Sequence, residues 1–124
     1  MKFLHIAAVL TAAVSTGAAA MPVDAFLAKA DALQAKGMMA MFSGDLKVLT
    51  AVIQSDAAAL RTEREAATAA RRTPSYCPPG PIKLGSNEIF QAMRAVPAAD
   101  RPHTDTRDVL RSYLSRRFPC PTGR

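Results

Sequence analysis

The sequence is poor in the residues from which β-sheet cores are usually built. Its 124 residues include no tryptophan, two tyrosines and five phenylalanines. So few aromatic residues disfavour a β-sandwich, whose strands require aromatic and β-branched side chains. The abundant alanines favour closely packed helices instead. The sequence shows no internal repeat and no hairpin signature, so it predicts an all-α fold.

The motifs of common catalytic sites are also missing. The chain has no glycine-rich phosphate loop, no G-x-S-x-G elbow and no C-x-x-C pair. Its two histidines, His5 and His103, do not fall in a metal-ligand spacing. The sequence therefore predicts a binding or structural protein, with no enzymatic activity, no cofactor and no metal site.

The first residues are organised like a secretory signal. Lys2 gives a positive start, residues 3–14 form a short apolar run, and Ala18-Ala19-Ala20 supplies small residues for cleavage. A membrane anchor is the alternative, but the run is too short to span a bilayer comfortably. We expect residues 1–20 to be removed as a signal peptide. Residues 21–124 would then form a single domain in the periplasm.

The two cysteines, Cys77 and Cys120, can form only one intramolecular pair. An exported chain meets an oxidising compartment, in which such a bond persists. Two free, buried thiols are the alternative, since cysteine also behaves as a small apolar residue. We expect the disulfide, which would contribute roughly 4 kcal/mol in the chain-entropy model.

Apolar spacing predicts a helical hairpin over residues 21–73. Pro22 suits the first turn of a helix and Gly37 suits its end. Ser43 or Asp45 can cap a second helix. The apolar face of this second helix is expected at Leu46, Leu49, Ile53, Ala57 and Leu60.

Four apolar residues lie at the corner between these two helices: Met38, Met39, Met41 and Phe42. Methionine clusters serve as adaptable binding surfaces, as metal-thioether sites or as core filling. No histidine or cysteine lies near them in the sequence to support a copper site. We expect these residues to fill the core between the two helices.

A proline-rich linker over residues 74–85 precedes two further helices within residues 86–120. Its prolines have a fixed φ, which makes it a stiff connector. Ser86 is expected to cap the third helix, and Thr104 or Thr106 the fourth. We expect two sets of side chains to pack together beneath the disulfide: Leu110, Tyr113, Leu114 and Phe118 against Ile89, Phe90 and Met93. The predicted fold is a small bundle of about four helices stapled by one disulfide.

Positive charge is concentrated in the second half of the chain. Residues 71–124 carry ten basic and four acidic side chains, whereas residues 21–70 carry five and six. Such a field favours an anionic partner: an acidic protein face, lipid headgroups or nucleic acid. We expect a protein partner and no nucleic acid. The candidate partner-binding residues are Arg94, Arg107 and Arg111, because the apolar stripe of the last helix is assigned to the core. A solvated face without a partner is the alternative.

The C-terminal half has a cysteine-bounded pattern. Cys77-Pro78 opens the pattern within the linker, two amphipathic helices follow, and Phe118-Pro119-Cys120 ends the pattern. This pattern resembles the Tai-type immunity proteins, small periplasmic helical proteins associated with type VI secretion. The resemblance implies a partner-binding protein that neutralises a peptidoglycan amidase effector, and some members of the family form homodimers. A stand-alone structural or envelope-associated protein with no toxin partner is the alternative function.

Overall fold

The computed structural model describes residues 20–122, which form four α-helices and two 3-10 helices. In chain order they are α1 (Val23–Lys36), η1 (Gly37–Phe42), α2 (Gly44–Ala69), α3 (Ser86–Arg94), η2 (Arg101–His103) and α4 (Thr106–Arg117). This part of the chain has no β-strand, so the predicted small all-α bundle is confirmed. None of its helices combines the length and the apolar character needed to cross a lipid bilayer. The predicted signal peptide lies outside the described residues, except for Ala20.

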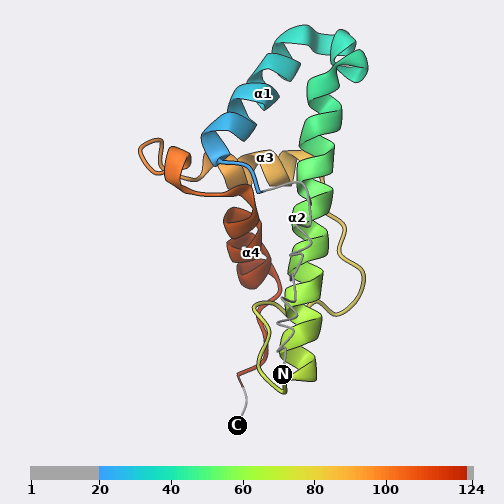
Figure 1. Ribbon diagram of the computed structural model, residues 1–124, viewed down its shortest axis with the longest axis vertical. Coiled ribbons are helices and arrows are strands. Elements are labelled where there is room, and N and C mark those ends of the chain that lie inside the picture. The colour runs from blue at the N-terminus through green and yellow to red at the C-terminus, as the bar shows by residue number, and fades with distance from the viewer. Residues whose placement is uncertain (1–19, 123–124) are drawn as a thin grey trace, which may run out of the picture.

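The helices α1 and α2 form a hairpin whose corner is η1 (Figure 1). Gly37 ends α1 with a φ of 56°, a conformation that glycine adopts because it has no Cβ. Ser43 caps α2, where its hydroxyl oxygen accepts a hydrogen bond from the backbone N–H of Asp45 at 3.3 Å. Both the predicted hairpin and this predicted cap are therefore confirmed.

The helix α4 packs along α2, and α3 crosses the molecule to contact both α1 and α4 (Figure 1). The predicted caps of α3 and α4 are wrong. Gly85 is the cap of α3, and its backbone N–H donates to Glu88 Oε2 at 3.0 Å. Asp105 is the cap of α4, and Thr106 lies in the first turn because its hydroxyl is engaged inside the bundle.

The core consists of two clusters of buried side chains, and each cluster combines residues from before and after the linker. The larger cluster contains Val23, Phe26, Leu27, Ala30, Leu33, Leu49, Val52, Met93 and Val109. The smaller cluster contains Leu60, Tyr76, Leu110 and Leu114. Both halves of the described chain therefore contribute to one helical domain.

The prediction that four side chains of the last helix pack beneath the disulfide is confirmed in part: Leu110 and Leu114 are buried, whereas Tyr113 and Phe118 are half-buried. The two buried leucines pack with Leu60 of α2 and with Tyr76 of the linker. Tyr76 enters the bundle beside α2 and α4, while Met93 of α3 lies in the larger cluster together with Val109 of α4.

The buried face of α2 differs from the predicted one. Its buried residues are Leu49, Val52, Asp56, Leu60 and Ala67. Leu46 and Ala57, which the predicted face included, are exposed. The spacing of three and four residues is the expected one, but the face is rotated so that a carboxylate enters the apolar stripe.

The prediction that the corner residues fill the core is wrong. The exposed fractions are 87% for Met38, 66% for Met39, 76% for Met41 and 85% for Phe42. The physical reason is that η1 projects beyond the bundle at the end of the hairpin, where α3 and α4 do not reach it (Figure 1). We refer to these four side chains as the apolar tip.

Candidate functional site

Each of the three candidate partner-binding arginines forms an ion pair within the chain. Arg94 of α3 reaches Asp31 of α1, with 2.6 Å between Nη2 and Oδ1. Arg107 of α4 lies 3.2 Å from Asp56 of α2, measured from Nε to Oδ1. These contacts join helices to one another. A partner that binds these arginines would have to compete with the internal ion pairs, and such binding stays a prediction.

Arg111 has the most carboxylate contacts of the three. Its Nε and Nη2 atoms donate to the two carboxylate oxygens of Glu63 at 3.1 and 2.8 Å, and its Nη1 donates to Asp108 at 2.5 Å. The hydrogen bond with Glu63 is the main reason that the pKa of Arg111 is raised above its usual value. The two-pronged contact fixes α4 against α2.

The least accessible charged group in the described chain is the carboxylate of Asp56, which is 0% exposed. Its Oδ2 accepts a hydrogen bond of 2.6 Å from the hydroxyl of Thr106, which is equally buried. Its Oδ1 accepts from Arg107 Nε at 3.2 Å. A buried carboxylate is tolerated only when it is hydrogen bonded and paired, and both conditions are met.

Asp56 is not among the residues predicted from the sequence, although a signal for it is present there. Leu49, Val52, Asp56 and Leu60 follow the spacing of a single helical face. An aspartate inside such a series indicates a buried polar contact, because an unpaired carboxylate would be expelled from the core. The sequence alone does not name its partners, which lie 50 and 51 residues away.

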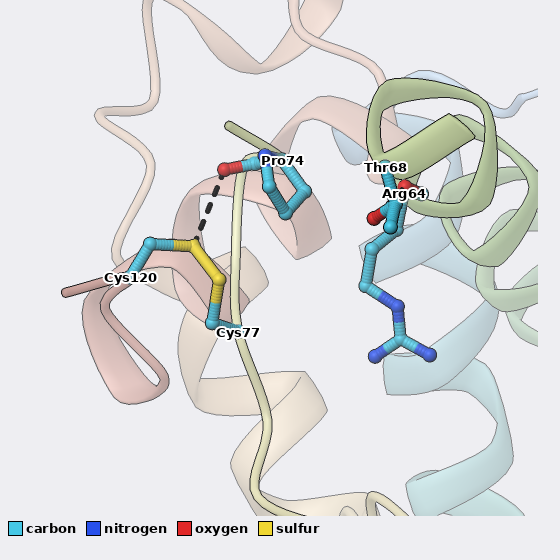
Figure 2. Close-up of a disulfide and its surroundings, with 5 residues drawn as sticks. All are labelled: Arg64, Thr68, Pro74, Cys77 and Cys120. Carbon is cyan, nitrogen blue, oxygen red and sulfur yellow. Dashed lines mark hydrogen bonds between the residues drawn. A yellow bond between two sulfur atoms is a disulfide. The ribbon is translucent and has the colours of Figure 1, made fainter. Parts of the chain in front are cut away.

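The opposite end of the molecule from the apolar tip is closed by the disulfide between Cys77 and Cys120, which confirms the predicted bond (Figure 2). The bond joins positions 43 residues apart. The backbone N–H of Cys77 also donates to the carbonyl oxygen of Phe118 at 2.8 Å. The Cys120 sulfur lies 3.3 Å from the carbonyl oxygen of Pro74, a close contact in which the bonded sulfur has no proton to donate. The linker and the end of α4 are thus held together, and we refer to this region as the stapled end.

A cleft of about 270 Å³ lies between α2, the linker and α4. Arg61 and Arg64 lie at this cleft, and the guanidinium carbon of Arg64 is 5.2 Å from the centre of the Tyr76 ring. At that distance the guanidinium is attracted to the face of the ring. The floor of the cleft includes Leu110 and Leu114, which already belong to the core. The cleft therefore opens onto packed side chains of the core.

The apolar tip offers a different kind of surface. In a 3-10 helix, side chains three positions apart lie on the same side. Met38 and Met41 therefore share one side of η1, while Met39 and Phe42 share the next. The three thioethers do not face a single point, which disfavours the metal-thioether alternative. The arrangement instead exposes flexible apolar side chains together with one aromatic ring.

Nothing between residues 20 and 122 resembles a conventional metal site. This part of the chain contains no group of three or more histidine, cysteine, aspartate or glutamate side chains that could hold a metal ion. Both cysteines are consumed by the disulfide.

Comparisons with protein-family models, with curated proteins and with solved structures found no match to this chain.

Proposed function

We propose that this chain is an exported, non-enzymatic binding protein of the periplasm that docks the apolar tip onto a protein partner. The proposed partner class is a secreted peptidoglycan amidase, which follows from the resemblance of the C-terminal half to Tai-type immunity proteins. The disulfide supports an oxidising compartment, because such bonds persist there.

The observation that carries the proposal is the exposure of the apolar tip. Each of its four side chains is at least 66% exposed in the isolated chain. Contiguous apolar surface of this kind marks interaction sites, because water contact with it is unfavourable. Methionine adapts its shape to a partner, and an aromatic ring such as Phe42 supplies a compact anchor.

The rest of the molecule holds the helices that carry the tip in an ordered arrangement. Ion pairs join α1 to α3 and α2 to α4, and the disulfide closes the far end. Helices that are already ordered lose little conformational entropy when a partner binds. Inhibition of a hydrolase would then be steric: the tip would cover the substrate-binding surface, with no chemical step performed by this chain.

The proposal is tested by capture from periplasmic extract on immobilised, oxidised protein, followed by an activity assay. Captured proteins are identified by mass spectrometry, and a captured hydrolase is assayed on purified peptidoglycan with and without this chain. We expect capture of a peptidoglycan amidase whose activity falls when this chain is added in equal amount.

The tip is tested with the double variant Met39→Ser/Phe42→Ser and a matched control, Ala58→Ser. Ala58 is an exposed apolar position on α2 outside the tip. We expect the tip variant to lose capture and the control to retain it. Capture of the same amidase by all three proteins would contradict docking through the tip, and the absence of any captured hydrolase would contradict the proposed partner class.

A stand-alone, envelope-associated protein is the alternative, and one observation favours it. Lys36 and Lys47 flank the tip, and Lys47 is exposed. Apolar side chains with lysines beside them can enter the headgroup region of an anionic membrane. Sedimentation with vesicles that contain anionic phospholipid, but not with neutral vesicles, would support this alternative.

A homodimer is tested by sedimentation velocity. A molecular mass twice that of the monomer, which falls to the monomer mass in the tip variant, would instead assign the tip to a homodimer.

A further inference from the structure

The start of α1 is attached to the start of α4 by a short set of backbone hydrogen bonds. The backbone N–H of Thr106 donates to the carbonyl oxygen of Met21 at 2.8 Å, and that of Val23 donates to the carbonyl oxygen of Thr104 at 2.9 Å. Pro22 and Asp105 form an antiparallel bridge between these segments. The position of the Met21 nitrogen is therefore determined by the backbone on both sides of the bridge.

One hydroxyl group separates that nitrogen from the buried carboxylate of Asp56. It donates to the hydroxyl oxygen of Thr106 at 3.4 Å. The same hydroxyl donates to Asp56 Oδ2 at 2.6 Å, and both side chains are 0% exposed. A single hydroxyl group thus links the backbone nitrogen of residue 21 to a carboxylate that is shielded from water.

The chemistry of this nitrogen changes if the chain is processed where the sequence predicts. Hydrolysis of the peptide bond between Ala20 and Met21 consumes one water. It leaves a carboxylate on Ala20 and an ammonium group on Met21. The neutral amide, with one proton to donate, is thereby replaced by a cation with three. A cation is attracted to a buried carboxylate much more strongly than an amide is, because little water screens the interaction.

We propose that Asp56 and Thr106 form a binding site for the ammonium group of Met21, a site that signal cleavage fills. Removal of the signal would then complete the core, and the processed chain would be more stable than the unprocessed one. The proposal rests on the proposed export and cleavage, but not on the apolar tip or on any partner. A folding experiment without a partner therefore distinguishes its failure from failure of the proposed docking.

Other charged groups are carried by the elements that pack around this site. They are Asp24 of α1, Arg101 and His103 of η2, and Asp105 and Arg107 of α4. Arg107 competes for Asp56, whereas Asp105 adds to the negative potential at the bridge. All of these groups are present whether or not the chain is extended at residue 21. At this site, a chain that begins at Met21 and a chain that is extended before Met21 therefore differ in the ammonium group, while the other charged groups stay the same.

The experiment compares residues 21–124, with a free amino group on Met21, and residues 18–124, which retain Ala18-Ala19-Ala20. Both chains contain every core residue and are oxidised before measurement. Urea unfolding at pH 6.5 should give a ratio of folded to unfolded molecules about tenfold lower for the extended chain. That factor corresponds to one pKa unit of differential interaction.

Two variants assign this difference to the buried carboxylate. Asp56→Asn keeps an oxygen that accepts from Thr106 but removes the charge, so the extension should no longer change the ratio. Asp105→Asn is the matched control at the bridge, and there the effect of the extension should persist. An extension effect that is absent from the natural sequence, or unchanged in Asp56→Asn, would overturn the proposal.

The pH dependence gives a second readout that needs no variant. An ammonium that pairs with a carboxylate has its pKa raised in the folded state, so its stabilisation is complete below the unfolded value of about 8. It is lost as the pH rises through the higher folded value. The two chains should therefore converge in stability between about pH 8 and pH 10. A constant difference over that range, or an exported protein whose N-terminal residue is not Met21, would overturn the proposal.

Discussion

The two ends of this molecule carry similar apolar side chains, which are buried at the stapled end and exposed at the apolar tip. At the stapled end, Tyr76 is 4% exposed and Leu114 is 3% exposed. At the apolar tip, Met38 is 87% exposed and Phe42 is 85% exposed. Tyr76 follows the end of α2 and the tip follows the end of α1, whereas Leu114 lies near the end of α4. The difference shows that burial at a helix end depends on whether another element reaches it.

At the stapled end, two additional elements reach the core. The linker returns along α2, and α4 ends beside it, where the disulfide joins them (Figure 2). At the tip the chain turns within η1 and continues directly into α2. Within residues 20–122, neither the linker nor α3 or α4 extends to this point, so the tip stays uncovered. The comparison therefore separates an end that stabilises the fold from an end that is available for binding.

The largest effect should follow from opening the stapled end. We expect the double variant Cys77→Ser/Cys120→Ser to lose roughly 4 kcal/mol of unfolding free energy, because the bond restricts the unfolded chain. Urea denaturation measures this loss, and the reduced natural protein serves as a second sample. A loss below about 1 kcal/mol would mean that hydrogen bonds alone hold the linker in place.

The next effect compares equivalent truncations at the two ends. Leu114→Ala should lose about 3 kcal/mol, because it leaves a cavity among packed side chains. Met41→Ala removes a side chain of similar size from the apolar tip, and it should change stability by less than about 0.5 kcal/mol. Thermal or urea unfolding of both variants tests the contrast. Equal losses would contradict the assignment of the tip to the surface.

A smaller effect is expected from the arginines of α4, and the internal ion pairs mean that reversing their charge would not leave folding intact. Arg107→Ala should lose about 2 kcal/mol, because Asp56 then stays buried without its cation. Arg111→Ala should lose no more than about 1 kcal/mol, since its pairs are partly exposed. Unfolding measurements in low and high salt check both values. A loss for Arg111→Ala that equals or exceeds that for Arg107→Ala would contradict this ranking.

The smallest effect on folding should come from the tip itself. Phe42→Ser should change the unfolding free energy by less than about 0.5 kcal/mol, because the ring makes little contact with the core. The same substitution should reduce capture of the protein partner. A destabilisation above about 1 kcal/mol would show that the ring packs on the bundle in solution.

The sequence was sufficient to predict the helices, because proline and glycine mark several of their ends and Ser43 marks the start of α2. The predicted caps of α3 and α4 were displaced from the observed ones, Gly85 and Asp105. The disulfide followed from the cysteine count. The tip could not be predicted, because an uninterrupted run such as Met38 to Phe42 has no polar residue to define a face. Asp56 and Tyr76 were missed for a related reason: their burial depends on partners far away in the sequence. Local patterns determine where a helix begins, whereas the packing of distant segments determines what is covered.

The most direct test of the contrast between the two ends uses methionines within the same chain. Met93 is 0% exposed, whereas Met38, Met39 and Met41 in the tip are exposed. Oxidation by dilute peroxide, followed residue by residue with mass spectrometry, reports the accessibility of each thioether. We predict rapid oxidation of the three tip methionines in the folded monomer and slow oxidation of Met93 until urea unfolds the chain. Equal protection of all four methionines would contradict an exposed tip and with it the proposed docking surface.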